Sequence, residues 1–125
     1  NVMAYDGGDG ERHSSYQFAV DCGTYWKETR GLPAYKVVLG VPFYARPSWA
    51  DYGAILDSAP EAYGGDHTAY NGMEVYYNGV DTIAEKTRYA RENLGGVMIW
   101  ELTQDTSDKS RSLLQAVGNS LKARR

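Results

Sequence analysis

Three short runs of apolar residues form the strongest pattern in the chain. They cover residues 2–5, 36–44 and 96–102, and they are rich in β-branched and aromatic side chains. None of them alternates apolar with polar positions, which is typical of parallel strands buried on both faces. We therefore expect three parallel strands.

Amphipathic helical patterns lie between and after these runs. Ser14 and Thr82 each stand three residues before a Gln or Glu, which is the spacing of a capping box at a helix start. Asp105 and Asp108 precede the last segment as its expected caps. Strands that alternate with helices predict an α/β fold with helical crossovers. The expected helices cover residues 15–30, 82–93 and 108–123.

A stretch rich in tyrosine and in turn signals, residues 47–79, interrupts the second crossover. It contains the dipeptides Gly64–Gly65, Asn71–Gly72 and Asn78–Gly79, which are typical of short hairpins. We expect a small insertion of one or two hairpins after the second strand. Its aromatic side chains are expected to form a miniature core, with the wall of a cleft as the alternative.

Composition narrows the classes of function. The 125 residues fit one domain, and their 13 basic and 16 acidic side chains give a formal net charge of −3. This balance argues against nucleic acid as a partner, and no apolar run is long enough to cross a membrane. The single cysteine excludes an internal disulfide, and no residue pattern implies a metal or organic cofactor. His13 and His67 are expected in surface or loop positions.

The residues at the ends of the three runs point to a binding site for a sugar. Parallel α/β folds place their chemistry at the carboxyl ends of the strands. The first run ends in Tyr5 and Asp6, the second leads into Tyr44 and Arg46, and the third ends at Trp100. An indole can pack on the apolar face of a pyranose ring, while acid, phenol and guanidinium groups bond its polar substituents.

These strand ends resemble glycoside hydrolase family 18, the chitinase-like glycosidases. The segment NVMAYD, residues 1–6, is similar to the strand-six motif M-x-Y-D of that family. The segment KVVLGVPFYAR, residues 36–46, is similar to its strand seven, K-x-V-L-G-V-P-F-Y-G-R, with Ala45 in place of Gly. The segment GGVMIWEL, residues 95–102, is similar to its strand eight, G-G-x-M-x-W-E.

The resemblance implies the carboxyl-terminal portion of a TIM (β/α)8 barrel. Residues 1–125 would supply about strands six to eight and their helices, and residues 47–79 would be an insertion after strand seven. A closed barrel takes about 250 residues. The protein partner of the chain would then be the missing part of the barrel, or a second copy bound through the open sheet edges.

The activity implied by the resemblance is hydrolysis of β-1,4-linked N-acetylglucosamine polymers by substrate-assisted, retaining catalysis. The general-acid Glu of the family lies on strand four, in a D-x-x-D-x-D-x-E motif that this sequence lacks. The nearest match, residues 6–13, carries His13 at the position of that Glu. The chain alone is therefore expected to be inactive. Its whole protein is expected to act on chitin outside the cytoplasm, because chitin is insoluble.

The motifs also imply a role for individual residues. In catalysis, Tyr5 would hold the acetamido oxygen of the substrate in line with the reacting carbon. Asp6 would position the sugar and bias the charge state of the acid. The residues implied to bind the substrate are Met3 beneath the acetamido methyl group, Trp100 as the floor of the subsite, and Tyr44 and Arg46 along the cleft.

Three alternatives remain open from the sequence. A chitin-binding lectin of the same fold would carry a different residue in place of the strand-four Glu. An endo-N-acetylglucosaminidase acting on N-glycans is a close relative and equally open. A self-standing α/β module of three strands that binds sugars or proteins belongs to another class, and its helices would have to cover both faces of the sheet.

Overall fold

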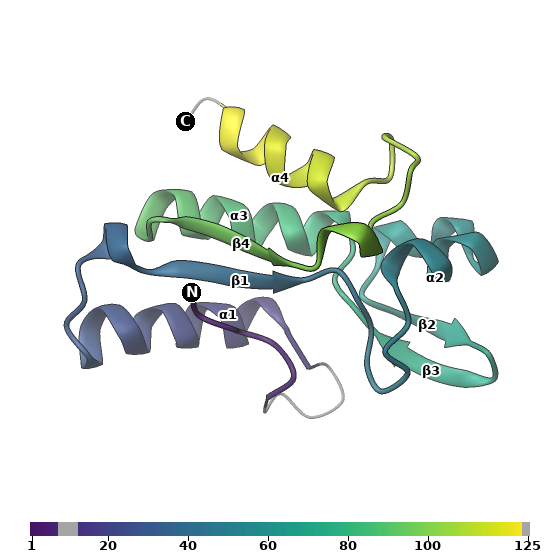
Figure 1. The fold of residues 1–125 in the computed structure, drawn as a ribbon, viewed down its shortest axis with the longest axis horizontal. Coiled ribbons are helices and arrows are strands. Elements are labelled where there is room, and N and C mark those ends of the chain that lie inside the picture. The colour runs from purple at the N-terminus through teal and green to yellow at the C-terminus, as the bar shows by residue number, and fades with distance from the viewer. Residues whose placement is uncertain (8–12, 124–125) are drawn as a thin grey trace.

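The computed structural model describes residues 1–7 and 13–123 and has a mixed α/β architecture (Figure 1). None of the helices in these ranges is both long and apolar enough to cross a lipid bilayer. Short 3-10 turns cover Ala34–Lys36, Pro60–Gly64 and Leu102–Gln104, and a π-helical turn covers Tyr25–Thr29. The helices and strands are α1 (Tyr16–Thr24), β1 (Val38–Pro42), α2 (Tyr52–Ser58), β2 (His67–Tyr70), β3 (Met73–Tyr76), α3 (Val80–Asn93), β4 (Gly96–Trp100) and α4 (Leu113–Lys122).

The second and third apolar runs form two of the three parallel strands that the sequence predicts, whereas the first run does not form a full strand. β1 pairs with β4 in parallel, with Gly40 opposite Met98. The first run adds one parallel bridge between Val2 and Leu39. The Val2 N–H donates to the Val38 carbonyl over 2.8 Å, and the Gly40 N–H donates to the Val2 carbonyl over 2.7 Å. The three runs therefore lie side by side with β1 in the middle.

One face of this sheet carries the hydrophobic core. Leu39 and Val41 of β1 are fully buried, and Val97 and Ile99 of β4 pack beside them. Helices α1, α3 and α4 contribute to the same core, and α3 contacts both strands as well as the other two helices (Figure 1). The apolar runs predict burial on both faces, but on the opposite face Trp100 is largely exposed.

The insertion folds as one helix and one hairpin. β2 and β3 pair in antiparallel register around Asn71 and Gly72, whose φ angles of 51° and 76° fit the left-handed positions of a type I′ turn. Helix α2 in the same segment was not expected. Tyr52 of α2 and Tyr77 after β3 are both buried, and their ring centroids lie 6.3 Å apart. Both rings belong to the same hydrophobic core as β1 and the helices, so the separate miniature core that the sequence predicts is wrong.

The predicted start of α1 is wrong by one residue. Ser15, not Ser14, caps the helix, because its Oγ accepts the Phe18 N–H over 3.1 Å. Ser14 is fully buried, and its hydroxyl donates to the Ala4 carbonyl over 2.7 Å. The side chain of Ser14 thus joins the helix start to the segment that precedes Tyr5.

The other two helix starts differ from prediction in part. α3 begins after Gly79 and not at Thr82, whose hydroxyl donates to Asp66 Oδ2 over 2.7 Å. The N-cap of α4 is Ser112, whose Oγ accepts the Gln115 N–H over 3.1 Å, while the Asp105 carboxylate accepts the first two N–H groups of the helix at 2.9 and 3.0 Å. Asp108 instead binds the N–H and hydroxyl of the serine two residues later.

Candidate functional site

The loops after the first two apolar runs meet at the carboxylate of Asp6. The Tyr44 hydroxyl donates to Asp6 Oδ2 over 2.6 Å, and Arg46 Nη1 lies 3.2 Å from Asp6 Oδ1. Asp6 has a φ of 61°, a left-handed conformation that aspartate tolerates better than most residues. We call Asp6, Tyr44 and Arg46 the Asp6 cluster.

Burial keeps the hydroxyl of Tyr44 protonated in the Asp6 cluster. Tyr44 is only 3% exposed. Burial raises the pKa of Tyr44 well above its usual value, and the bond to Asp6 raises it further. The phenol therefore stays protonated and acts as a donor to the carboxylate. Arg46 adds a positive charge beside Asp6, with side-chain exposures of 31% for both residues.

Tyr5 lies beside the Asp6 cluster on the sheet face that the helices leave open. Its ring meets the Tyr44 ring edge to face at a centroid distance of 6.1 Å. A Cβ atom on Gly40 of β1 would come within 3.0 Å of Tyr5 Cε1 and 3.1 Å of the Met98 methyl carbon. Glycine at this position therefore leaves the room that Tyr5 fills. Burial raises the pKa of the Tyr5 hydroxyl, and the charge of Asp6 adds to that effect.

Trp49 extends the cluster, and sequence reasoning placed it only among the aromatic residues of the insertion. Its indole stacks on the Tyr44 ring at 5.7 Å with an interplanar angle of 16°. The Arg46 guanidinium carbon lies 3.9 Å from the indole centroid, in cation–π geometry. Trp49 is 57% exposed, so it does not belong to the hydrophobic core. Pro47 lies in the short loop between Arg46 and Trp49. It was the only signal in the sequence that the chain turns here and brings Trp49 back to Arg46.

His13 is the second residue that sequence reasoning missed. It lies in a loop, as expected, but it is only 3% exposed, so the expected surface position is wrong for it. Its Nδ1 lies 3.3 Å from the main-chain nitrogen of Asp6, and its Nε2 lies 3.3 Å from the carbonyl oxygen of Tyr44. For His67 the expectation is confirmed, since its ring is exposed and pairs with Glu74 over 2.7 Å. No spacing rule in the sequence distinguishes the two histidines.

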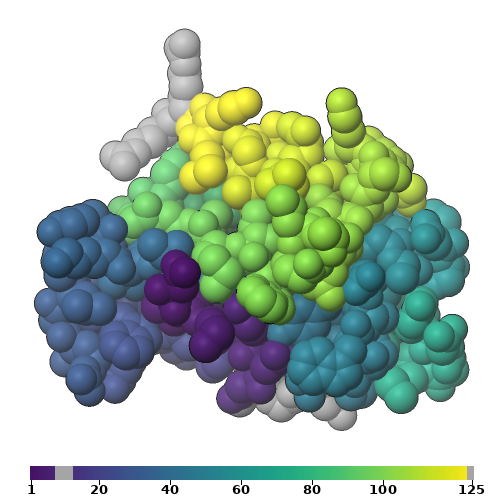
Figure 2. All heavy atoms as spheres, viewed as in Figure 1, coloured from purple at the N-terminus to yellow at the C-terminus, as the bar shows by residue number. Residues whose placement is uncertain are grey.

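The other two predicted binding residues, Met3 and Trp100, lie at the open side of the sheet. Met3 is 70% exposed and Trp100 is 57% exposed. The Trp100 carbonyl accepts the Phe43 N–H over 2.8 Å, which fixes the end of β4 against the end of β1. The Trp100–Glu101 peptide bond is cis. Figure 2 shows the N-terminal residues and β4 on the same face of the molecule.

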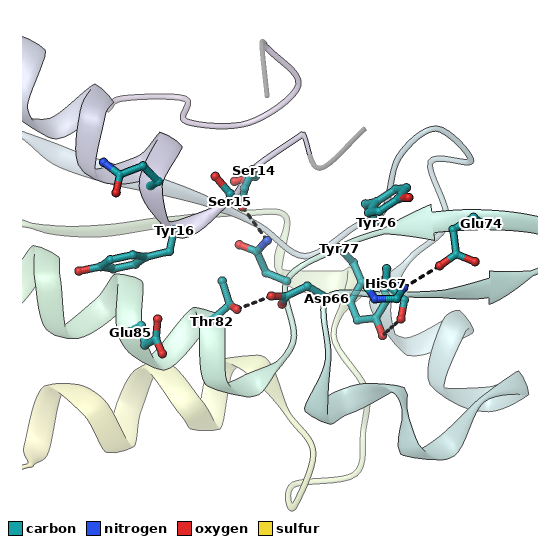
Figure 3. Close-up of a pocket in the computed structure, with 12 residues that line it drawn as sticks. Ser14, Ser15, Tyr16, Asp66, His67, Glu74, Tyr76, Tyr77, Thr82 and Glu85 are labelled. Carbon is teal, nitrogen blue, oxygen red and sulfur yellow. Dashed lines mark hydrogen bonds and ion pairs between the residues drawn. The ribbon is translucent and has the colours of Figure 1, made fainter. Parts of the chain in front are cut away.

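A separate hollow of about 1060 Å³ lies between the start of α1, the hairpin and the first turns of α3 (Figure 3). None of the predicted site residues lines it. Its Asp66 accepts hydrogen bonds from the Gly79 N–H and the Thr82 hydroxyl, and its Glu74 pairs with His67. Asp66 thus joins the insertion to the start of α3, whereas the pair of Glu74 and His67 lies within the hairpin.

The comparison with protein families decides the family. The family model described as glycosyl hydrolases family 18 matches residues 1–105. The chain belongs to glycosyl hydrolase family 18. No curated protein sequence matches this family 18 chain.

Solved structures of family 18 chitinases share the fold. The GH18 chitinase ChiB from the chitin utilization locus of Flavobacterium johnsoniae is 34% identical, with a TM-score of 0.81 over 95% of this chain and 40% of that one. A chitinase from Bacteroides thetaiotaomicron is 31% identical, with a TM-score of 0.81 over 98% of this chain and 44% of that one. The family 18 chain thus spans less than half the length of either chitinase.

A more distant structure shares the fold alone. The protein YKL-39, solved in the presence of chitooligosaccharides (GlcNAc4), is 23% identical, with a TM-score of 0.69 over 99% of this chain and 45% of that one.

Proposed function

We propose that this chain is the carboxyl-terminal portion, from strand six to helix eight, of the (β/α)8 barrel of a chitinase-like glycosidase. Two observations support this placement. The chain matches 40% and 44% of the two bacterial chitinases. The sheet is covered by helices on one face only, as expected for a barrel wall whose other face lines the interior. Residues 47–79 are the insertion after strand seven.

The proposed substrate is chitin or a β-1,4-linked N-acetylglucosamine oligosaccharide. The observation that carries this proposal is the Asp6 cluster with Tyr5 beside it, at the carboxyl ends of the strands. Tyr5 holds the acetamido oxygen of the substrate, and Asp6 positions the sugar and biases the charge of the acid. Exposed Met3, Trp100 and the Tyr44–Arg46 wall line the subsite. The reaction is substrate-assisted and retains the anomeric configuration.

The general-acid Glu of this reaction comes from a segment upstream of residue 1. A general acid contributes roughly 10²–10⁴ in rate, so residues 1–125 alone are inactive. The same upstream segment supplies the strands that cover the open sheet face. We place the protein outside the cytoplasm, where an insoluble polymer is accessible.

The test is the stereochemistry of chitotetraose hydrolysis. The complete protein is mixed with chitotetraose, and proton NMR follows which anomer of the product appears first. We expect the β-anomer first from the complete protein and no product from residues 1–125. First appearance of the α-anomer contradicts the retaining mechanism, and product from residues 1–125 contradicts the placement of the acid. Binding without hydrolysis by the complete protein supports the lectin instead.

A further inference from the structure

His13 links the main chains of two strand ends. Its Nδ1 faces the Asp6 N–H at 3.3 Å, and its Nε2 faces the Tyr44 carbonyl oxygen at 3.3 Å. The imidazole also contacts the Tyr44 ring at a centroid distance of 5.3 Å. Asp6 and Tyr44 are therefore joined twice, once through their own side chains and once through the buried ring of His13.

The two partners of the ring specify one protonation state. The Asp6 N–H can only donate, so Nδ1 must present its lone pair, and the Tyr44 carbonyl can only accept, so Nε2 must carry the proton. Only the neutral imidazole with the proton on Nε2 satisfies both contacts. An imidazolium would place an N–H group against the Asp6 N–H, although it would gain the Asp6 carboxylate oxygen 3.4 Å from Nδ1.

Burial favours the neutral form of the His13 ring. Burial lowers the pKa of His13, while the Asp6 charge and the Tyr44 carbonyl act in the opposite direction. The positive charges of Lys86 and Arg46 lower the pKa of His13 further. At neutral pH the buried ring is therefore uncharged.

A buried network anchors the residue next to His13. Lys86 of α3 is fully buried, and its Nζ donates to the carbonyl and the hydroxyl of Ser14, each over 2.7 Å. It also donates to Asn78 Oδ1 over 2.5 Å, and the Asn78 amide donates to the Ser14 carbonyl over 2.8 Å. Ser14 in turn holds the Ala4 carbonyl. The main chain next to His13 is thus fixed to α3 and to the segment that precedes Tyr5.

We propose that His13 is a positioning residue of the Asp6 cluster. As a neutral imidazole anchored through Ser14 and Lys86, it holds the left-handed main chain of Asp6 against the end of β1. It thereby sets the direction from which the Asp6 carboxylate meets the sugar. The kinetic part of this inference rests on the proposed glycosidase function, whereas its structural part does not.

The first measurement uses the complete protein and no sugar. Ring ¹⁵N chemical shifts of His13 report its tautomer, and the Asp6 amide signal reports the contact. We expect the proton on Nε2 at neutral pH. His13→Phe keeps much of the ring volume and removes both bonds, so the Asp6 amide signal shifts. His67→Phe, at the exposed histidine, leaves that signal in place. An imidazolium or a proton on Nδ1 in the unsubstituted chain overturns the proposal even if the variant does not fold.

The second measurement follows chitotetraose hydrolysis by the complete protein. We expect His13→Phe to lower kcat about tenfold with little change in KM, because the hydrogen bond to the Asp6 N–H, which orients the carboxylate, is worth about that factor. His13→Asn offers an amide oxygen to the Asp6 N–H and restores kcat to within about threefold of the unsubstituted protein. Equal kcat values for His13→Phe and His67→Phe overturn the proposal. An inactive unsubstituted protein whose His13 carries its proton on Nε2 contradicts the glycosidase function alone.

Discussion

The hydroxyl of Tyr44 donates to Oδ2 of Asp6 over 2.6 Å, although 38 positions separate the two residues in the sequence. This bond joins the loop after the first strand run to the segment after β1. It occurs at the sheet edge where a parallel α/β fold carries its chemistry. The Asp6 carboxylate also accepts a hydrogen bond from Arg46, with Nη1 lying 3.2 Å from Oδ1.

Tyr44→Phe removes this bond while keeping the ring that contacts Trp49 and Tyr5. We expect the free energy of unfolding to fall by about 1 kcal/mol, because one hydrogen bond to a partly exposed carboxylate is lost. Urea unfolding of the two proteins measures the difference. Tyr63→Phe, at an exposed tyrosine, is the control and should stay within about 0.5 kcal/mol. An equal effect of the two substitutions contradicts the contribution assigned to the bond.

Alkaline pH should destabilise the fold through Tyr77. Burial is the main reason that its pKa is raised from 10.0 to about 12, and its hydroxyl donates to the Ala62 carbonyl over 2.6 Å. The folded state therefore binds more protons than the unfolded state between these pH values. The contribution of Tyr77 to stability is complete below pH 10 and is lost as the pH rises, with a slope of up to about 1.4 kcal/mol per pH unit.

Urea unfolding at several pH values between 9 and 12 tests whether the free energy of unfolding falls as the pH rises. Tyr77→Phe should give a shallower fall of stability with pH than the unsubstituted chain. Tyr35→Phe, at a tyrosine that is 73% exposed, should leave the slope unchanged. A slope that is the same in all three proteins shows that Tyr77 does not contribute to the alkaline loss.

Lys86→Met removes the buried ammonium group that binds Ser14 and Asn78. We expect a loss of roughly 2–4 kcal/mol, since buried oxygen acceptors lose charge-assisted hydrogen bonds that no water replaces. The midpoint of urea unfolding measures it. Lys109→Met, at an exposed lysine, should change stability by less than about 0.5 kcal/mol. A more stable Lys86→Met variant would refute the assigned contribution.

Gly40→Ala tests the close approach of the first run to β1. The added methyl carbon would lie 2.5 Å from the Val2 carbonyl oxygen, a main-chain atom that can move only with the strand. We expect a loss of about 2 kcal/mol. Gly118→Ala in α4 meets no atom within 4 Å and should stabilise the chain by about 0.5–1 kcal/mol, because alanine favours helix. Thermal unfolding of both variants should therefore show shifts of opposite sign.

Local sequence features identify the strands and the hairpin. The apolar composition of two runs was enough to predict β1 and β4, and Asn71–Gly72 was enough to predict the hairpin turn. Helix α2 was missed because seven residues are too few to show a helical period. The Thr82 prediction failed because Asp66, from the insertion, takes its hydroxyl. Such a partner is decided by tertiary structure, which spacing along the chain does not encode.

The residues of the candidate site also fall into two groups, those that the sequence predicts and those that it does not. Asp6, Tyr44 and Arg46 lie at strand ends, so the fold class already predicts that they converge. His13 and Trp49 lie in loops, where the chain direction depends on contacts far apart in sequence. A lone histidine or tryptophan carries no pattern that distinguishes a buried link or a cleft wall from a surface residue.

The most direct test of the account is the rate of chitotetraose hydrolysis by the complete protein with and without Asp6→Asn. The substitution keeps the shape of the side chain and removes its charge, which Tyr44 and Arg46 both contact. We predict a fall in kcat of at least about hundredfold, typical of the loss of a charged group that acts in the transition state. Asp21→Asn, at the exposed carboxylate on α1 that accepts the Gln17 amide, should leave kcat unchanged. An Asp6→Asn protein as fast as the unsubstituted one would contradict the assignment of the site.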